Sequence, residues 1–502
     1  MNHVEPLLGL EAGMRILVGN DGVLTVDADL ARAFRPGDAL FVVPAGGQVL
    51  HIPQAERKLA QDAVSRATDA VPALRAASDA QLATFFRTFA ARLEDDQVWR
   101  EVVLENARDV ERARARGRST TRLETSEAMR KSMAEGLRAW QDARSVRGRV
   151  LETVAHDGWQ AELVGAELGV VAFVFEGRPN VVSDATGVLR GGNAVVFRIG
   201  SDALGTAKKI LELCTWPALD QAGLPRGAVT IVDSAAHAAG WALFLDARLS
   251  LAVARGSGPA VATLGTLAQS AGIPVSLHGT GGAWIVAAES ARAADFEQCV
   301  FDSLDRKVCN TLNTCCIVRS AAAELMPAFL RGLERAASRR QTSYKLHVAS
   351  GSEGAVPKEL FTRLVPVERA SGTHQEPQAE PIARTELGHE WEWEGTPEVT
   401  LCLVDDVAEA VQLFNQQSPK FVACLCSEDR AEHDRFYESV DAPFVGDGFT
   451  RWVDGQYALS RPELGLSNWE RGRLFGRGGI LSGDSVYSVR TRVTGTSRGK
   501  PG

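Results

Sequence analysis

The sequence predicts an α/β protein with a small β-rich segment at its N-terminus. Between Gly169 and Asp305, strand-like runs alternate with helical stretches; the strand-like runs are GVVAFVF, NAVVFRI, AVTIVD, LSLAVAR, PVSLHG and AWIVAA. This alternation is typical of a parallel sheet covered by helices. The first part of the chain, residues 1–54, contains instead short strand-like runs separated by turns.

The composition is that of an ordinary globular protein. Hydrophobic residues make up 45% and charged residues 24% of the 502 positions, which excludes the disordered, collagen-like and coiled-coil classes. The formal net charge of −8 argues against a large nucleic-acid-binding surface. No apolar run approaches the roughly 18 residues of a membrane helix, and the polar start of the chain does not resemble a secretory signal. We therefore expect a cytoplasmic protein without membrane contact.

The N-terminal third is predicted to combine hairpins with helices. MRILVGNDGVLTV contains an Asn-Asp-Gly turn, and DALFVVPAGGQVLHIP turns over Gly46-Gly47. Across residues 53–146 the pattern is helical, and its runs of Arg and Glu are typical of solvated helix faces. RVLETVAHDGWQAELVGAELG then alternates on both sides of Asp157-Gly158, which predicts a third hairpin.

A second α/β segment is expected across residues 308–445. It contains ERASGTHQEPQAEP, which its polar, Pro-rich composition predicts to be an exposed loop. The final SVYSVRTRVTG alternates again and could be a strand that pairs with the early hairpin. The domains we expect are a β-rich extension (1–54), a cofactor-binding domain (55–275, with a hairpin arm at 147–168), a catalytic domain (276–448) and a returning C-terminal segment (449–502).

Cys309 is a candidate nucleophile. It follows Arg306 and Lys307 and precedes a segment that can begin a helix, and both features would stabilise a thiolate. A lone cysteine among apolar residues is more often structural, and this interpretation suits Cys315 and Cys316 better because they run into the strand CCIV. The eight cysteines form no CxxC motif and no zinc-ligand spacing, so no metal site is expected.

Asn180 stands in a turn between a strand and a helix. In VVAFVFEGRPNVVSDATG, the strand ends at Glu176, a Gly-Arg-Pro-Asn turn follows, and a helix begins. An isolated Asn at such a place is usually a helix cap. Its functional interpretation is a hydrogen-bond donor that stabilises an oxyanion opposite a nucleophile.

Two further strand-to-helix turns are candidate cofactor sites. NAVVFRI ends in Gly200-Ser201-Asp202 before a helix, as expected of a site for the adenine ribose. ARGSGPAVATLG, residues 254–265, is a Gly-rich turn whose amides could face a pyrophosphate. The second motif is weak by itself, because such turns also serve ordinary packing between a strand and a helix.

In order and spacing, these motifs resemble the γ-glutamyl phosphate reductases (glutamate-5-semialdehyde dehydrogenases), a branch of the aldehyde dehydrogenase superfamily. The similarity runs from about residue 55 to about residue 490. FEGRPNVVSDATGVLRGGNAVVFRIGSDA, ARGSG and VCNTLNT carry it, and VDDVAEAV, FTRWVDG and the RG of GRGG support it. The resemblance implies an aldehyde-dehydrogenase-like α/β fold with a Rossmann-like cofactor domain, an α/β catalytic domain and a β arm that pairs subunits into a homodimer or homotetramer.

The resemblance also implies a role for each matched residue. Cys309 would accept the acyl group, and Asn180 with the Cys309 backbone amide would form the oxyanion hole. The adenosine end of the cofactor would be lined by Arg198, Gly200, Ser201 and Asp202, and its phosphates by Arg255, Gly256, Ser257 and Gly258. Glu394 would hold the nicotinamide ribose, although Glu392 competes for this alignment. Substrate would contact Arg178, Asn310 and Arg451.

These parts imply an NADPH-dependent reductase, with NADH as the alternative cofactor, that makes an aldehyde from an acyl phosphate through a cysteine thioester. Arg198 and Arg255 could meet a 2′-phosphate, whereas Asp202 would favour a free ribose hydroxyl. Hydrolytic relatives use a glutamate base, but the corresponding stretch SLHGTGGAW has no acid. His278 could act as a base there, although a packed histidine is the simpler interpretation.

The sequence departs from the family pattern where substrate is expected. Pro419-Lys420-Phe421 replaces a His-Thr-acid segment, and VGDGFT lacks the family's Asn before Arg451. A different acyl phosphate, or a thioester carried by CoA or a carrier protein, is therefore an alternative substrate; an upstream kinase or carrier protein would deliver it. A catalytically silent scaffold is a third hypothesis, against which Cys309 and Asn180 argue. The N-terminal extension is expected to serve oligomerisation or docking.

Overall fold

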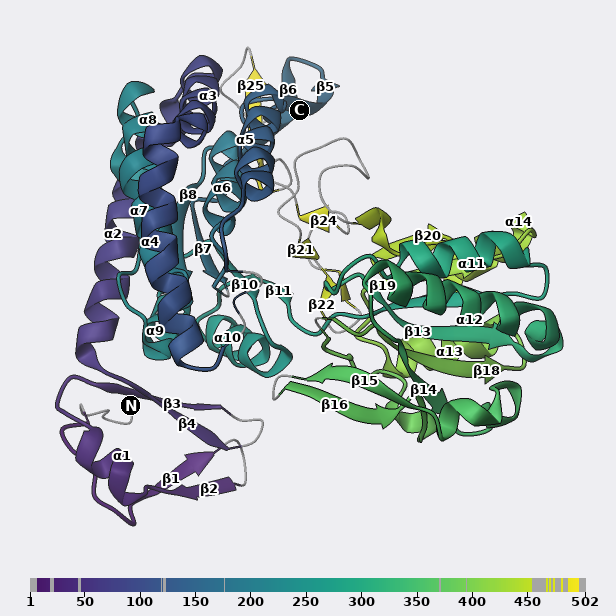
Figure 1. Ribbon diagram of the computed structural model, residues 1–502. Coiled ribbons are helices and arrows are strands. Elements are labelled where there is room, and N and C mark those ends of the chain that lie inside the picture. The colour runs from purple at the N-terminus through teal and green to yellow at the C-terminus, as the bar shows by residue number, and fades with distance from the viewer. Residues whose placement is uncertain are drawn as a thin grey trace. The chain divides into compact units, whose positions relative to one another are not determined.

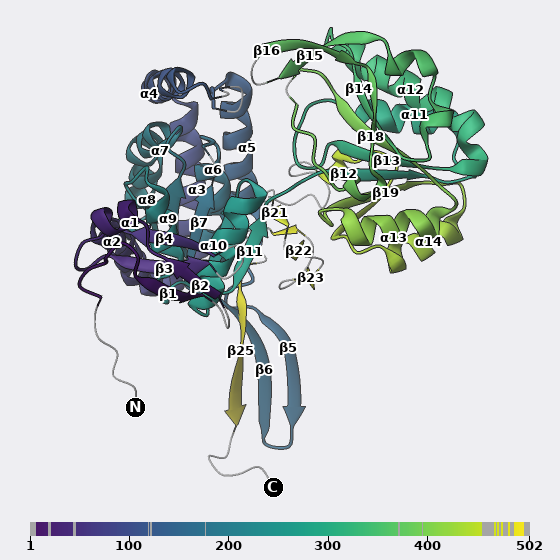
Figure 2. The same cartoon turned by 90° about the horizontal axis from the view of Figure 1, so that it is seen from below.

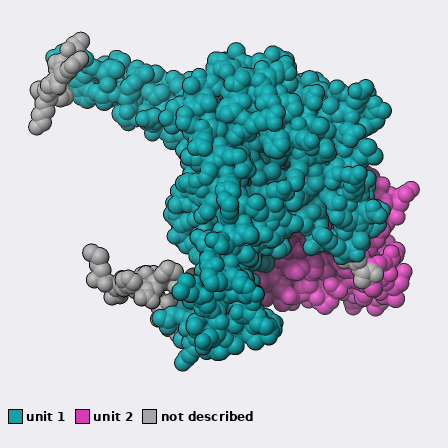
Figure 3. Space-filling view, turned by 90° about the vertical axis from the view of Figure 1, so that its left-hand side faces the viewer, with its two compact units in different colours: residues 1–279, 461–466, 481–502 teal, residues 280–460, 467–480 magenta. Residues whose placement is uncertain are grey.

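A computed structural model describes residues 7–18, 22–43, 47–118, 120, 123–175, 177–369, 372–393, 395–453, 466–467, 469–470, 473–474, 480–481 and 486–495. The chain forms two compact units, which Figure 3 shows in different colours. Unit 1 comprises residues 1–279, 461–466 and 481–502, and unit 2 comprises residues 280–460 and 467–480. No helix among the described residues combines the length and apolarity needed to cross a membrane.

Unit 1 is built on a five-stranded parallel sheet in the order β11-β10-β7-β8-β9 (Figure 1). Its strands are β7 (Val170–Phe175), β8 (Ala194–Ile199), β9 (Val229–Ile231), β10 (Leu251–Arg255) and β11 (Val275–His278). Every residue of β7 and β8 is buried, as expected of strands covered on both faces. The predicted parallel sheet is confirmed.

One strand expected in this sheet lies elsewhere. AWIVAA forms β12 (Ala283–Ala287), which belongs to unit 2 and pairs with two strands of that unit. The preceding HGTGG explains the difference, because its glycines let the chain leave the first sheet; Gly282 adopts a φ of +110°. Strand periodicity alone carries no information about which sheet a strand joins.

Helices pack around the unit 1 sheet, and the longest are α2 (Gln54–Ala76), α3 (Asp79–Glu94), α4 (Asp96–Ala115), α5 (Glu127–Asp142) and α10 (Gly258–Ser270). Helix α3 illustrates why these segments are helical. Ser78 and Gln81 form a capping box at its start, and Leu82, Phe85, Phe86, Phe89 and Leu93 form its buried face. The predicted helical segment 53–146 is therefore confirmed.

The N-terminal segment forms the two predicted hairpins. Strands β1 (Arg15–Val18) and β2 (Gly22–Thr25) pair antiparallel, as do β3 (Ala39–Val43) and β4 (Gln48–Ile52). Their turns, 19–21 and 44–46, lie outside the described residues. Strand β4 packs on α9 (His237–Phe244), and β3 packs on α10. Leu50 and Ile52 are buried in the core of unit 1, so the second hairpin is part of this unit.

A separate three-stranded antiparallel sheet extends from unit 1 as an arm (Figure 2). Strands β5 (Val150–His156) and β6 (Trp159–Ala166) form the predicted hairpin, with Gly158 at φ +77° in its turn. Strand β25 (Ser488–Gly495), from the end of the chain, pairs with β6 along its whole length. The alternating C-terminal segment therefore completes the hairpin at 147–168.

Unit 2 contains a seven-stranded parallel sheet in the order β17-β14-β18-β13-β12-β19-β20. The strands besides β12 are β13 (Leu312–Val318), β14 (Lys345–Ala349), β17 (Ala379–Ile382), β18 (Glu398–Val404), β19 (Val422–Cys426) and β20 (Phe444–Asp447). Alternate residues of β12 and β13 belong to two hydrophobic clusters. One cluster includes α11 (Ala293–Asp302) and α12 (Ala322–Arg339), and the other includes α13 (Val407–Gln417) and α14 (Arg430–Ser439).

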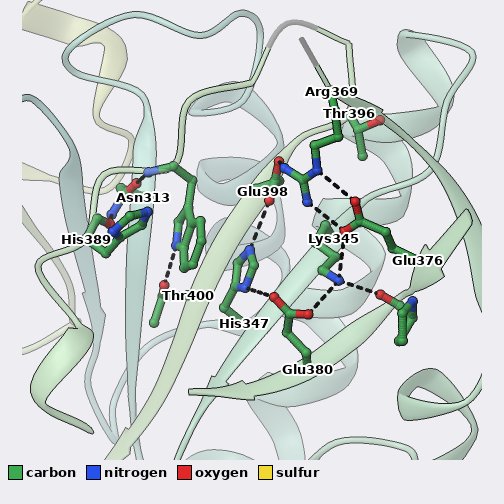
Figure 4. A network of polar contacts seen from close by, with 12 residues as sticks. Asn313, Lys345, His347, Arg369, Glu376, Glu380, His389, Thr396, Glu398 and Thr400 are labelled. Carbon is green, nitrogen blue, oxygen red and sulfur yellow. Dashed lines mark hydrogen bonds and ion pairs between the residues drawn. The ribbon is translucent and has the colours of Figure 1, made fainter. Parts of the chain in front are cut away.

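The expectation of a loop at ERASGTHQEPQAEP is wrong, although residues 372–375 are exposed as expected. Its described residues continue β15 (Leu364–Arg369) into β16 (Gly372–Pro377), an antiparallel pair, and then form β17. Figure 4 shows the reason: charged residues of this segment meet a buried polar network on the adjacent strands. Arg369 donates to both oxygens of Glu376 at 2.8 and 2.7 Å and to Glu398 at 2.6 Å. These ion pairs fix the strands against their weak intrinsic β-propensity.

Candidate active site

Cys309 lies in a tight turn immediately before β13. The Gly282 amide donates to the Cys309 carbonyl oxygen at 2.7 Å. A Cβ atom at position 281 would lie 2.6 Å from Cys309 Cα, so only glycine allows this close approach. The helix expected after Cys309 is absent, because β13 begins at Leu312. Thr311 holds the turn instead: its Oγ1 donates to Arg306 O at 2.6 Å and accepts from Val308 N at 2.8 Å.

Glu390 connects both sides of this turn. Its Oε1 accepts from Lys307 Nζ at 2.7 Å, and its Oε2 accepts from the Gly281 amide at 2.6 Å. The Lys307 side chain is only 4% exposed, so its charge is matched by Glu390 rather than by solvent. This contact could not be predicted from the sequence, because Glu390 stands 83 residues from Lys307 in a stretch without a recognised motif.

Two predicted substrate-binding residues of unit 2 contact each other. Arg451 is buried, donates through Nε to Asp305 at 2.6 Å, and donates through Nη1 to the Asn310 side chain. Thr450 Oγ1 donates to the Asn310 carbonyl oxygen at 2.6 Å. Arg451 thus supports the residue that follows Cys309.

The other cysteines are mostly packed in the core. Burial raises the pKa of Cys214 and Cys424 to about 12, and it raises the pKa of Cys315 well above its usual value. Cys316 and Cys426 are also buried in hydrophobic clusters, as their strand positions predict. Among the eight thiols, only Cys299 and Cys309 are partly exposed. This exposure favours Cys309 as the nucleophile over its neighbours in β13.

Asn180 does not cap a helix with its side chain. It precedes α6 (Val181–Ala185), with no side-chain capping bond, and its Nδ2 donates to Asp184 Oδ2 at 3.0 Å. Both residues line a cavity of about 200 Å³ in unit 1, together with Arg178, Met129, Ser132 and Met133. The helix-cap interpretation is therefore wrong for the Asn180 side chain, and Asn180 lines a cavity instead.

The predicted cofactor residues line one larger cavity of unit 1, with a volume of about 600 Å³. Those that contribute are Arg198, Gly200, Ser201, Asp202, Arg255, Gly256 and Ser257. Gly258 begins α10, whose first residues have no side-chain cap, so the amides at this helix end can donate to an anion. Gln48 and Leu50 of β4 also line this cavity. This arrangement fits the phosphates and adenosine of a dinucleotide.

Three arginines contribute differently from the sequence-based expectation. Arg198 is buried, and its Nη2 donates to the carbonyl oxygens of Ala235 and Ala236 at 3.0 Å. Arg118 donates to Asp202 at 2.7 Å, and Arg116 lies 3.6 Å from the same carboxylate. The run ERARARG by itself predicts a solvated helix face. A charged run on a helix does not show that the end of this helix lies beside the carboxyl end of a strand.

His278 is packed rather than placed as a base. It ends β11 and is only 6% exposed. Burial, together with the charges of Arg255 and Arg178, lowers the pKa of His278 to about 3. The side chain is therefore neutral near neutral pH and a weak base.

Glu394, the expected ribose contact, lies outside the described residues, as does the GRGG segment. The competing Glu392 is exposed. At the departure from the family pattern, Lys420 adopts a φ of +55° and pairs with Asp441 at 2.5 Å. Phe421 is buried and packs edge-on against Phe444. No group of three or more metal-ligating side chains occurs in the described part of the chain.

A family model for the aldehyde dehydrogenase family matches residues 41–344. The chain belongs to the aldehyde dehydrogenase family. It is similar to the γ-glutamyl phosphate reductase of Rhodopseudomonas palustris strain BisB18, with 30% identity over 410 residues that cover 79% of this chain and 85% of the relative. The corresponding reductase of Nitrobacter winogradskyi is 26% identical over 452 residues, which cover 88% and 96% of the two chains.

Solved structures of this family share the fold. γ-Glutamyl phosphate reductase of Thermotoga maritima matches with a TM-score of 0.74 at 20% identity, over 88% of this chain and all of that one. Lactaldehyde dehydrogenase of Escherichia coli matches with a TM-score of 0.64 at 16% identity, over 91% and 96% of the two chains. The predicted aldehyde dehydrogenase fold is confirmed. The chain is an aldehyde dehydrogenase-type oxidoreductase that resembles glutamate-5-semialdehyde dehydrogenases, as the motifs predicted.

Proposed function

We propose that this protein reduces an acyl phosphate to an aldehyde through a thioester at Cys309. The observation that carries the proposal is the Cys309 turn: a partly exposed thiol in a turn fixed by Gly281, Gly282 and Glu390. The names of the reductases similar to this chain support the choice of acyl phosphate. A catalytically silent scaffold would not need a partly exposed thiol in a turn fixed in this way.

The chemistry has two stages: formation of a thioester at Cys309, and its reduction to the aldehyde. The Cys309 thiolate attacks the acyl carbon, the C–O bond to phosphate breaks, and inorganic phosphate leaves with the bonding pair. A nicotinamide cofactor supplies the hydride when bound. The resulting hemithioacetal loses the cysteine sulfur and forms the aldehyde. Asn180 donates an N–H to the oxyanion of each step in this proposal.

The lack of an acid in HGTGG suits a reductive enzyme. A general base near the thioester would activate water and waste the acyl group. His278 does not supply one, because its pKa is lowered to about 3 by burial and by Arg255 and Arg178. Glu390 is engaged by Lys307 and the Gly281 amide, which hold both of its oxygens.

For the cofactor, we propose NADPH in preference to NADH. Asp202 is the acid that would favour a free ribose hydroxyl, but Arg118 and Arg116 already hold it. The same two guanidinium groups approach Ser201 Oγ at 3.3 and 3.4 Å, so they can bind a 2′-phosphate at this end of the cavity. Arg118, rather than the buried Arg198, is the cation that we assign to this role.

We propose a substrate that carries an anionic group but differs from γ-glutamyl phosphate in its head group. Arg178 lines the cavity beside Asn180 and can pair with a carboxylate or phosphate. Where the family's polar segment stands, Phe421 packs into the core and Lys420 pairs with Asp441. Losing a polar head-group contact can change discrimination by several orders of magnitude.

The test is the reverse reaction with purified protein. Candidate aldehydes, including glutamate-5-semialdehyde, are oxidised with NADP⁺ or NAD⁺ in the presence of phosphate, and reduced cofactor is followed by absorbance. We expect phosphate-dependent reduction of NADP⁺ that Cys309→Ser abolishes. Oxidation that depends on CoA instead of phosphate would favour the thioester alternative. No oxidation of any aldehyde under either condition would reject the function.

A further inference from the structure

The Asn180 amide is held by a carboxyl group from the next helical turn. Asn180 Nδ2 donates to Asp184 Oδ2 at 3.0 Å, and Ser183 Oγ lies 3.5 Å from Asp184 Oδ1. An Asn side chain has two N–H donors on Nδ2, so one remains for another acceptor. The bond to Asp184 therefore fixes the direction of the donor that remains.

The surroundings of Asp184 make its charge variable. Its cavity is lined on the α5 side by Met129, Ser132 and Met133, none of which carries a charge. Burial raises the pKa of Asp184 to about 6, although the charges of Arg255 and Arg178 and the bonds from Ser183 and Asn180 oppose the rise. His278, which faces the same arginines from β11, stays neutral in this range.

The two protonation states of Asp184 constrain the amide differently. An ionised carboxylate only accepts hydrogen bonds, so it binds Asn180 Nδ2 and repels Asn180 Oδ1. A protonated carboxyl can also donate to Asn180 Oδ1, and this allows the amide to turn over. In the turned amide, the oxygen would point where the second N–H of Asn180 pointed before.

We propose that Asp184 is a positioning residue that, when ionised, holds the Asn180 amide so that its second N–H, rather than its oxygen, is available to the oxyanion. The proposal rests on the proposed function, in which Asn180 is the oxyanion donor. In this proposal Asp184 does not touch the reacting atoms. Its effect on the rate passes entirely through Asn180, so removing Asp184 should have no effect once Asn180 has been removed.

The experiment follows acylation of Cys309 by 4-nitrophenyl acetate, which needs neither phosphate nor the physiological acyl group. Single-turnover release of nitrophenolate is measured for the wild type, Asp184→Ala, Asn180→Ala and the double variant. We expect Asp184→Ala to slow acylation about 10- to 100-fold, within the loss caused by removing one oxyanion donor. In the Asn180→Ala background, we expect Asp184→Ala to cause no further loss. Additive losses, or wild-type acylation in Asp184→Ala, would overturn the proposal.

A pH series separates positioning from a merely structural role. The ratio of the wild-type rate to the Asp184→Asn rate cancels the ionisation of Cys309. We expect this ratio to be near one below pH 6 and to rise to a plateau above pH 6, where the wild-type carboxyl is ionised. A flat ratio between pH 5 and pH 8 would contradict the proposal. Asp220→Asn, at an exposed acid paired with Arg226, is the matched control and should leave the rate unchanged.

The outcomes distinguish the two proposals. Ester acylation without turnover of any acyl phosphate would reject the proposed function and leave Asp184 in its positioning role. A flat pH ratio with normal acyl phosphate reduction would reject Asp184 alone. Absence of acylation in the wild type would reject both. Cofactor binding and thermal melts of each variant verify that the protein is folded.

Discussion

At the scale of single residues, exposure separates the cysteines. Cys315 and Cys316 are fully buried, whereas Cys309 and Cys299 are partly exposed. A thiol must reach both solvent and the thiolate state to react with an alkylating agent.

We therefore expect iodoacetamide at mildly alkaline pH to modify Cys309 while Cys315 and Cys316 remain unmodified, as measured by peptide mass spectrometry. Cys309→Ser should abolish aldehyde formation and leave cofactor binding nearly unchanged. Cys299→Ser is the control, because it removes the other partly exposed thiol and should retain activity. Full activity in Cys309→Ser would show that another residue accepts the acyl group.

Some residues of the candidate site could be predicted from the sequence, and others could not. One cavity is lined by residues at the carboxyl ends of strands that their apolar runs predict: Gly200, Ser201 and Arg255. Glu390 reaches Lys307 only through tertiary structure. Asp184 could have been noticed, because a residue four positions after Asn180 shares its helical face.

At the scale of elements, buried charges attach the β15–β16 hairpin to the unit 2 sheet. Lys345 is fully buried, and its Nζ donates to Pro377 O and Glu380 Oε2 at 2.9 Å. His347 stacks on Trp391 with ring centroids 3.4 Å apart and lies 3.0 Å from both Glu380 and Glu398 (Figure 4). Lys345 and Arg369 in this network each pair with two carboxylates.

We expect Lys345→Met to destabilise unit 2 by about 2–4 kcal/mol, because it removes one partner of a buried pair. Hydrogen bonds from Arg369 and His347 lower the pKa of Glu376 and Glu380 to about 2. Carboxylates with a lowered pKa stabilise the fold above their ordinary pKa and lose this effect as the pH falls toward about 2. The stability gap should therefore narrow below about pH 4.5.

Denaturant unfolding at several pH values measures the gap. The exposed Lys358→Met in the same unit is the control and should change stability by less than about 0.5 kcal/mol. A gap that stays constant down to pH 2 would mean that Lys345 acts by packing rather than by charge.

The β3–β4 hairpin has a position that its sequence did not suggest. The N-terminal segment is expected to serve oligomerisation or docking, and two of its residues, Gln48 and Leu50, also line the cavity of the candidate cofactor site. Gln48 is exposed, so it can be changed without opening the core.

We expect Gln48→Trp to fill part of this cavity and weaken NADPH binding about tenfold, or by about 1.4 kcal/mol. Fluorescence titration of the reduced cofactor measures the change. Gln48→Ala, which leaves the cavity open, should bind nearly as the wild type does. Equal affinity in all three proteins would place the cofactor away from β4.

Most of the helices and strands could be predicted from the sequence. Hairpins and parallel strands follow from alternation and from apolar runs, as in β5–β6 and β7. Two errors share one cause: β12 joined another sheet, and the polar segment at β15–β16 became strands through ion pairs with distant residues. The local sequence pattern predicts whether a segment is a strand or a helix. The strands with which it pairs depend on residues far along the chain.

At the scale of the whole molecule, one face of the arm carries an apolar row. Val493 lies opposite Ala161, and Ala161 lies opposite Val154, so these three side chains form a row across the three strands. Val493 is 61% exposed and Val154 is 44% exposed. The next row has Arg492 bonded to Glu162 at 2.7 Å on the other face.

We expect this apolar row to be covered by a second copy of the chain. Val154→Glu combined with Val493→Glu should lower the molar mass measured by light scattering after size exclusion, because a charge on the row would be buried in the interface. Thr494→Glu, exposed on the opposite face, is the control and should keep the wild-type mass. An unchanged mass in the double variant would exclude this face as the interface.

Because β25 lies near the end of the chain, β6 lacks this partner strand during most of synthesis. Unit 1 ends its first segment at residue 279, yet Asn193 Nδ2 donates to the carbonyl oxygen of Val486 at 2.8 Å, and β25 follows directly. At a ribosomal rate of about 5–20 residues per second, the intervening chain takes roughly 10–40 s to make. Throughout that interval the nascent β6 has an uncovered edge, which is open to pairing with neighbouring nascent chains on the same message.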